Sequence, residues 1–74
     1  MRLSDLKINE SGVVLKISSI GSLRRRLLDM GITNNTEIKI IKRAPLGDPI
    51  EIFLRGYELI VREEDAKLIE VKKI

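Results

Sequence analysis

Hydrophobic and polar residues alternate with a period of two along most of this chain. Isoleucine, leucine and valine take every second position in five short segments, with charged or polar residues between them. The segments lie at about residues 13–18, 37–41, 50–55, 58–62 and 69–72. A period of two is typical of strands that bury one face and leave the other wet. The pattern therefore predicts mainly β structure, with Val13, Leu15 and Ile17 sharing one face of the first strand.

Turn residues separate these segments. The second and third segments are separated by the sequence Leu46-Gly47-Asp48-Pro49. This sequence predicts a hairpin loop, because glycine tolerates a positive φ and proline can be the first residue of a strand. Gly56 predicts a second tight turn, and the run Glu63–Ala66, which lacks the strand period, predicts one short helical turn. Five or so short strands joined in this way suit a small, strongly bent β-barrel in which one sheet covers its own core.

One segment has helical spacing instead. Leu23, Leu27 and Met30 stand at positions i, i+4 and i+7, so they share one face of a helix and are expected to pack on the barrel. Ser22 is a good N-cap residue, and Gly31 fits the C′ position that follows a helix. The sequence therefore predicts one short inserted α-helix, from about Ser22 to Met30.

The composition confines the chain to a single small domain, residues 1–74. Hydrophobic residues make up 43% of it, enough for a packed core, and it contains no cysteine and no histidine. Disulfides and cysteine-ligated zinc are excluded, and the commonest general base is missing. The serines stand at turns or caps, where they serve structure, and the acids Glu63-Glu64-Asp65 suit a solvated turn. We expect no enzymatic activity and no cofactor.

Charge and aromatic content narrow the class of partner. The net charge of +3 is small, and apart from Arg24–Arg26 the chain lacks the basic stripe of a nucleic-acid binder. One Phe, one Tyr and no Trp are too few to line a groove for proline-rich peptides or to stack single-stranded bases. The first residues carry no apolar core of a secretory signal, and no apolar run is long enough for a membrane span. We expect a cytoplasmic protein that either docks on another protein through aliphatic and arginine contacts or binds a nucleic-acid duplex or backbone through charge.

Three consecutive arginines, Arg24, Arg25 and Arg26, stand early in the predicted helix. The N-terminal end of a helix is partly positive, so cations there are unfavourable by roughly 0.3–1 kcal/mol each. Two explanations stay open: long stems that shield apolar surface, and docking on an acidic partner surface or a phosphate. An arginine finger that enters another protein's nucleotide site is a third. Arg25 also stands four residues before Asp29 and can pair with it.

Leu28 lies off the apolar face of the predicted helix, one turn from Arg24. An exposed leucine is common on small domains, but an apolar residue rimmed by arginine is also typical of a protein interface. The apolar loop residues Ala44, Pro45 and Leu46 would extend the same contact patch if loop and helix lie together. Ordinary turn geometry is the alternative explanation for this loop.

Two longer motifs resemble those of the FeoA family, small cytosolic accessory proteins of bacterial ferrous iron uptake. One covers Gly21–Ile32 and includes the three arginines; the other covers Ala44–Ile50. The similarity continues at positions between Gly56 and Ala66, so it extends over nearly the whole chain. The chain departs from the family pattern at Asn34-Asn35, where a Pro-Gly turn is common, although asparagine tolerates the left-handed region. The resemblance implies an SH3-like small β-barrel with a helix inserted after the first long strand.

The resemblance also implies a partner rather than a reaction. FeoA-like proteins act on the cytosolic side of FeoB, a membrane iron permease with a GTP-binding domain. We interpret the chain as a non-enzymatic adaptor that docks on such a permease, and as a candidate modulator of its GTPase or transport activity. The predicted contact residues are Arg24, Arg25, Leu28, Leu46 and Asp48. The alternative is a small-barrel nucleic-acid-binding or transcription-regulatory module, and a weak homo-oligomer also stays open.

Overall fold

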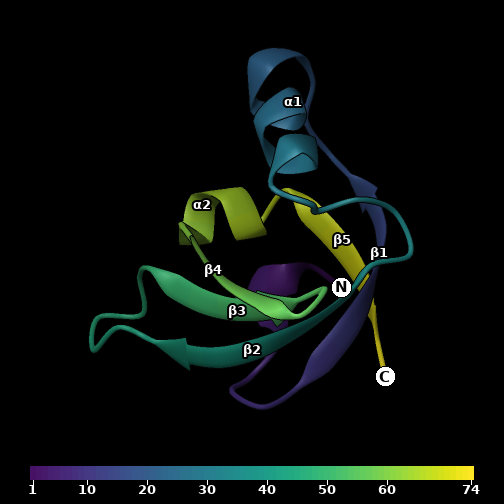
Figure 1. The fold of residues 1–74 in the computed structure, drawn as a ribbon. Coiled ribbons are helices and arrows are strands. Elements are labelled where there is room, and N and C mark those ends of the chain that lie inside the picture. The colour runs from purple at the N-terminus through teal and green to yellow at the C-terminus, as the bar shows by residue number, and fades with distance from the viewer.

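A single antiparallel sheet of five strands, with one helix inserted after the first strand, makes up most of the chain. The computed structural model describes all of Met1–Ile74. In chain order, the elements are a 3₁₀ turn η1 (Leu3–Asp5), β1 (Ser11–Ile17), α1 (Gly21–Asp29), β2 (Glu37–Arg43), β3 (Ile50–Leu54), β4 (Tyr57–Val61), α2 (Glu63–Ala66) and β5 (Ile69–Lys73). The strand order in the sheet is β4-β3-β2-β1-β5, and the sheet curls strongly (Figure 1). The predicted five strands, inserted helix and second helical turn are confirmed.

The core consists of aliphatic side chains from the inward face of this curled sheet. Alternate residues of β2 and β3, such as Ile38, Ile40 and Ile52, are fully buried, as the period of two predicts. The N-terminal segment adds Leu3 and Leu6 to the same cluster. No regular period marked these two leucines in the sequence, and the structure alone assigns them to the core.

The face of β1 that points inward differs from the predicted one. Val14 and Ile17 are buried, whereas Leu15 keeps 54% of its surface exposed. The pairing of β1 with β5 shifts register between Val14 and Lys16. Such a bulge inserts one extra residue and moves the following side chains to the opposite face. The interpretation that Leu15 shares a core face with Ile17 is therefore wrong.

The helix α1 lies one residue earlier than the predicted range Ser22–Met30. Ile20 rather than Ser22 is the N-cap, and it makes no side-chain capping hydrogen bond. The predicted C′ position of Gly31 is confirmed: it follows the C-cap Met30 with a φ of 94°. Its N–H donates to the carbonyl of Leu28 at 3.0 Å, one of the two bonds of a Schellman motif.

The β3–β4 hairpin fastens the C-terminal end of α1 to the sheet. The Tyr57 hydroxyl donates to the carbonyl of Met30. Arg55 donates from Nε to the carbonyl of Gly31 at 3.3 Å and from Nη2 to Thr33 Oγ1 at 2.7 Å. A β-carbon at Gly31 would meet the Tyr57 hydroxyl. Glycine is therefore required there both by the backbone conformation and by this close approach.

Gly31→Ala is expected to lower the free energy of unfolding by about 1–3 kcal/mol, because alanine is strained at positive φ and its methyl group displaces Tyr57. Gly47→Ala is the matched control, since Gly47 has a similar φ of 91° but nothing within 4 Å of its added β-carbon. Urea unfolding of both variants measures the difference. Equal losses would contradict a packing role for the Tyr57 hydroxyl.

The two outer strands of the sheet differ in what covers their edges. The N-terminus covers β5: the N–H of Val71 donates to the carbonyl of Met1 at 2.8 Å, and Arg2 forms an isolated bridge with Glu70. The backbone of β4 pairs with β3 alone. The sheet therefore has one covered edge and one unpaired edge.

Glu10 connects the turn before β1 to the end of β5. Its carboxylate lies 2.6 Å from Lys73 Nζ and accepts the backbone N–H of Lys7 at 2.7 Å. The hydrogen bond from Lys73, followed by that from Lys7, holds the pKa of Glu10 below its usual value. A carboxyl whose pKa is lowered by folding stabilises the folded chain above its unfolded pKa, and this contribution is lost as the pH falls through the lowered pKa.

Glu10→Gln is expected to lower the melting temperature slightly at neutral pH, and this difference is expected to shrink at about pH 2.5, as the pH falls toward the lowered pKa of Glu10. The change is small because the pair is partly exposed to water. Thermal unfolding of both proteins at the two pH values tests this. An equal difference between them at both pH values would show that the charge of Glu10 does not contribute.

Candidate docking surface

The helix α1 stands on the sheet and leaves one side facing solvent (Figure 1). Leu27 is fully buried, and Leu23 and Met30 pack partly buried against the core, so the predicted apolar face is confirmed. Leu28 lies outside this face and keeps 36% of its surface exposed. The outer side of α1 thus presents a partly embedded leucine next to arginines that are all exposed.

The three arginines of α1 have different contacts. Arg24 donates from Nη1 to the carbonyl of Ile17 at 3.3 Å, which ties the helix to the end of β1. Arg26 forms an ion pair with Asp65 of α2 at 3.0 Å. Arg25 makes no hydrogen bond or ion pair, and the predicted pairing with Asp29 is absent. Of the three, Arg25 is the cation with no contact inside the chain.

Asp65 is buried, with 8% of its surface exposed. The expectation of a solvated acidic turn at Glu63–Asp65 is therefore wrong for this residue. Its carboxylate keeps the guanidinium of Arg26 as partner, and the pair connects α1 to α2. Sequence reasoning missed this contact because the two residues stand 39 positions apart.

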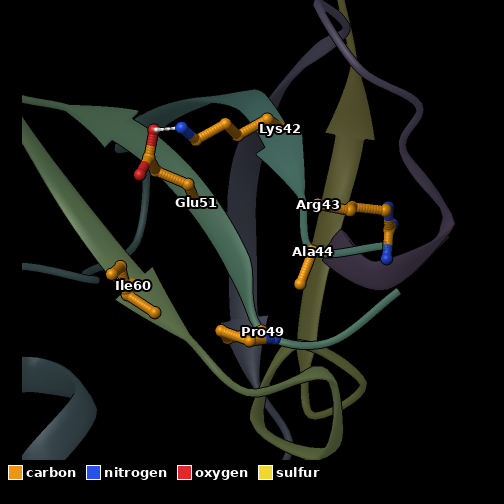
Figure 2. Close-up of a pocket in the computed structure, with 6 residues that line it drawn as sticks. All are labelled: Lys42, Arg43, Ala44, Pro49, Glu51 and Ile60. Atoms are coloured by element: carbon orange, nitrogen blue, oxygen red, sulfur yellow. Dashed lines mark ion pairs between the residues drawn. The ribbon is translucent and has the colours of Figure 1, made fainter. Parts of the chain in front are cut away.

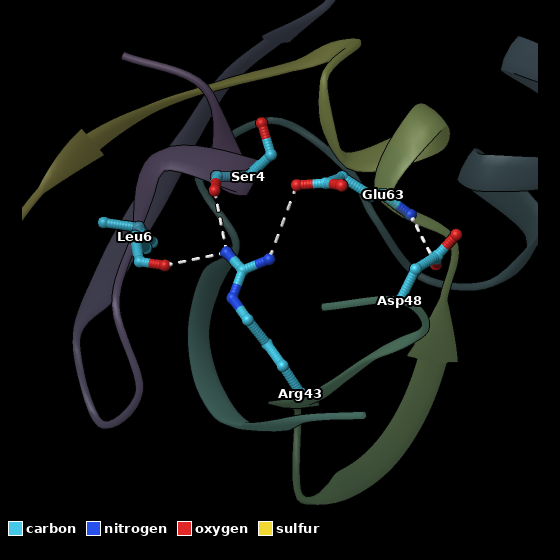
Figure 3. Close-up of polar contacts among 5 residues, drawn as sticks. All are labelled: Ser4, Leu6, Arg43, Asp48 and Glu63. Atoms are coloured by element: carbon cyan, nitrogen blue, oxygen red, sulfur yellow. Dashed lines mark hydrogen bonds and ion pairs between the residues drawn. The ribbon is translucent and has the colours of Figure 1, made fainter. Parts of the chain in front are cut away.

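A second arginine contact fixes the region around the first hairpin. Arg43 Nη2 donates to the carbonyls of Ser4 at 2.7 Å and Leu6 at 3.0 Å, and its Nη1 lies 3.7 Å from a carboxylate oxygen of Glu63 (Figure 3). The carboxylate of Asp48 accepts the backbone N–H of Glu63 at 3.0 Å. This N–H belongs to the first turn of α2. A carboxylate at this position accepts a hydrogen bond from an otherwise free N–H group and interacts favourably with the positive end of the helix dipole. Asp48, predicted as a contact residue, thus has a partner within the chain.

The tip of the first hairpin is the most exposed apolar point among the predicted contact residues. Leu46 keeps 97% of its surface exposed. At the base of the same loop, Ala44 and Pro49 line a shallow pocket of about 120 Å³ together with Ile60 (Figure 2). An ion pair of 3.9 Å between Lys42 and Glu51 borders this pocket. The loop therefore offers an apolar tip beside a small apolar hollow.

The predicted contact residues fall into two groups rather than one patch. Arg24, Arg25 and Leu28 lie on α1, and Leu46 and Asp48 lie in the loop between β2 and β3. Figure 1 shows α1 and this loop extending in different directions, with α2 between them. A partner would have to be broad enough to contact both groups at once.

No arrangement typical of a catalytic or metal centre accompanies these two groups. Acidic side chains do not gather in any group of three or more that could hold a metal ion. The polar contacts described above join segments of the chain to one another. Neither α1 nor α2 has the length and apolarity that a membrane-spanning helix needs.

The sequence that forms this barrel and its inserted helix matches the model of a known family. The model of the FeoA domain matches residues 1–73. The chain belongs to the FeoA family. It is accordingly a non-catalytic accessory protein of ferrous iron transport, and the resemblance seen in its motifs is confirmed.

Solved structures support the FeoA assignment and the fold. A FeoA-like protein from Clostridium acetobutylicum is 40% identical with a TM-score of 0.93, covering all of this chain and 86% of that one. The zinc complex of Stenotrophomonas maltophilia FeoA, described as an SH3 domain protein, is 25% identical with a TM-score of 0.84, covering 97% of this chain and 89% of that one. The predicted SH3-like barrel is therefore confirmed.

One curated relative contains both proteins of the transport system. The fusion of Fe(2+) transport protein A with the Fe(2+) transporter FeoB in Porphyromonas gingivalis is 36% identical over 74 residues, all of this chain and 9% of the fusion. A manganese-dependent transcriptional repressor has the same fold, with a TM-score of 0.91 over all of this chain and 36% of the repressor, but only 18% identity. The repressor shows that the FeoA fold also occurs as one part of a longer protein.

Asp48→Ala is expected to lower the free energy of unfolding by about 1 kcal/mol, because the N–H of Glu63 loses its acceptor at the start of α2. Asp48→Asn is the control, since its amide oxygen can still accept this hydrogen bond. Chemical denaturation of the two variants beside the wild type measures the effect. If Asp48→Ala is as stable as the wild type, the capping role is wrong and the carboxylate is free for other contacts.

Proposed function

We propose that this FeoA protein docks on the cytosolic side of a FeoB-like iron permease through the outer side of α1, and thereby supports ferrous iron uptake. The observation that carries the proposal is the relative in which a domain 36% identical to this chain is covalently joined to FeoB. Fusion raises the effective concentration of one module near the other, which favours pairs that work in contact. Where the two modules are separate chains, the FeoA module reaches the permease through a docking surface.

Arg25 and Leu28 are the residues best placed for that contact. Leu28 offers apolar surface that is still exposed, and Arg25 offers a cation with no partner inside the chain. An interface centre is typically apolar, with arginine among the residues enriched around it. The complementary surface on the permease is therefore expected to combine an apolar pocket with a carboxylate.

The other predicted contact residues contribute less to the proposed contact; they are Arg24, Leu46 and Asp48. Arg24 is bonded to the end of β1, so it contributes at the rim while holding the helix. Leu46 at the loop tip supplies a second, separate contact. Asp48 acts indirectly, because its carboxylate caps α2 beside the loop. Comparison of Leu28 and Leu46 variants shows whether the permease contacts α1 alone or both groups. A contact with α1 alone is sensitive only to the Leu28 variant.

Leu28→Glu is expected to weaken binding to the permease by about tenfold or more, because a carboxylate would be buried in an apolar contact. Arg25→Glu is expected to weaken binding by a similar factor through charge repulsion, without loss of any intramolecular contact. Ile8→Glu is the matched control, since Ile8 is 51% exposed and belongs to the turn before β1. This turn precedes the start of β1, whereas α1 follows the other end of that strand.

Binding is measured by titration against the purified permease, and ferrous iron uptake is measured in cells that express each variant at the wild-type level. Thermal unfolding verifies that the variants fold. Normal binding and uptake with both Leu28→Glu and Arg25→Glu would show that α1 is not the docking surface. GTP hydrolysis by the cytosolic domain of the permease, with and without this protein, separates modulation of turnover from docking alone.

A further inference from the structure

We propose that the free edge of β4 pairs with the same edge of a second copy of this chain, forming a two-fold symmetric dimer with a continuous sheet. The inference starts from the asymmetry of the sheet edges. The N-terminus covers β5, whereas β4 bonds only to β3. An edge strand with unpaired N–H and carbonyl groups is a template for another strand.

The turn that precedes β4 determines which residues face the free edge. Arg55 and Gly56 both have positive φ, as in a two-residue type I′ hairpin turn. Leu54 and Tyr57 are the residues that close this hairpin, and alternate pairs beyond them exchange hydrogen bonds. The backbone groups of Glu58 and Ile60 therefore point away from β3. Arg62, two residues further and still extended at φ −78° and ψ 151°, continues this series with its N–H only, because its carbonyl accepts the N–H groups of Asp65 and Ala66 at the start of α2.

The side chains of these three residues are exposed on the outer face of the sheet. Ile60 keeps 61% of its surface exposed and borders the shallow pocket at the base of the first hairpin (Figure 2). Neither Glu58 nor Arg62 belongs to any of the ion pairs of the chain. The free edge thus presents an acid, an isoleucine and a base at alternate positions, and the two charged side chains have no ion-pair partner in the chain.

This order of residues is complementary to itself when the two strands run antiparallel. With the two-fold axis at Ile60, each Glu58 lies opposite Arg62 of the second copy, and the two isoleucines contact each other. Opposite charges and aliphatic pairs across antiparallel strands are stabilising. A symmetric patch of this kind closes a dimer and does not extend into a fibre.

Other registers do not place Glu58 opposite Arg62. An axis at Glu58 or at Arg62 places like charges opposite each other, and an axis at Leu59 places Glu58 against the second copy's isoleucine. In a parallel, in-register pairing, each charged residue would lie beside the same residue of the second copy, so like charges would meet. The charge pattern therefore selects both the direction and the register of pairing. One short strand on each side buries little surface, so the dimer is expected to be weak.

Sedimentation equilibrium of the full chain from about 10 µM to about 1 mM tests the proposal, the range in which a weak association becomes measurable. The wild type is expected to pass from monomer to dimer. Glu58→Arg and Arg62→Glu, each of which creates two like-charge pairs, are expected to raise the dissociation constant about tenfold. The double variant, which restores opposite charges, is expected to return it to near the wild-type value.

Glu37→Arg is the matched control, because Glu37 is exposed, carries no ion pair and lies on β2, away from the edge. A wild type that stays monomeric at about 1 mM would overturn the proposal. A dimer that is unaffected by both single variants would also overturn it, since the interface would lie elsewhere. If the single variants lose permease binding while the wild type is monomeric, a strand of the permease occupies this edge and the proposal is wrong.

Discussion

Closure of a very small hydrophobic core is the constraint on which the rest of this structure depends. Fifteen aliphatic side chains form the core, the chain has no cysteine that could cross-link it, and acidic side chains do not gather in any group of three or more that could hold a metal ion. A short curled sheet cannot cover such a cluster by itself, because a chain of this length buries only about 60% of its unfolded surface. Leu3, Leu6 and Leu27 are therefore drawn in from segments outside the sheet. This explains why the N-terminal segment and α1 belong to the fold rather than being additions to it.

Arginine side chains supply much of the remaining cohesion between segments. Arg43 binds two carbonyls around η1, Arg55 binds the loop after α1, and Arg26 pairs with the buried Asp65. Each contact joins segments that the thin core alone holds weakly, and hydrogen bonds to a charged donor are stronger than neutral ones. Most of these cations are therefore structural, and the small net charge of the chain says little about its partner.

The same contacts bear on the proposed function. A helix of nine residues is too short to persist alone in water, so its orientation comes from packing and from its ties to β1, α2 and β4. A surface held in this way loses little entropy when a partner binds it. Arg25 and Leu28 are thus presented on a helix that is held by hydrogen bonds to three neighbouring segments. The free edge of β4 adjoins the base of the first hairpin, where Ile60 and Arg62 line a pocket with Asp48, so self-association would compete with docking through that loop but not with a contact made by α1 alone.

The sequence by itself determined the strands, the two tight turns, the inserted helix and the family, because side-chain period and turn chemistry depend on near neighbours. It also placed Leu28 and the arginines outside the core face. Only the tertiary structure decided that a bulge exposes Leu15, that Asp65 is buried, that Asp48 caps α2, and that the contact residues form two groups. These features depend on residues far apart in the chain, such as Arg26 and Asp65, 39 positions apart. Which of them meet is determined by how the sheet curls, a property of the whole fold that local patterns do not carry.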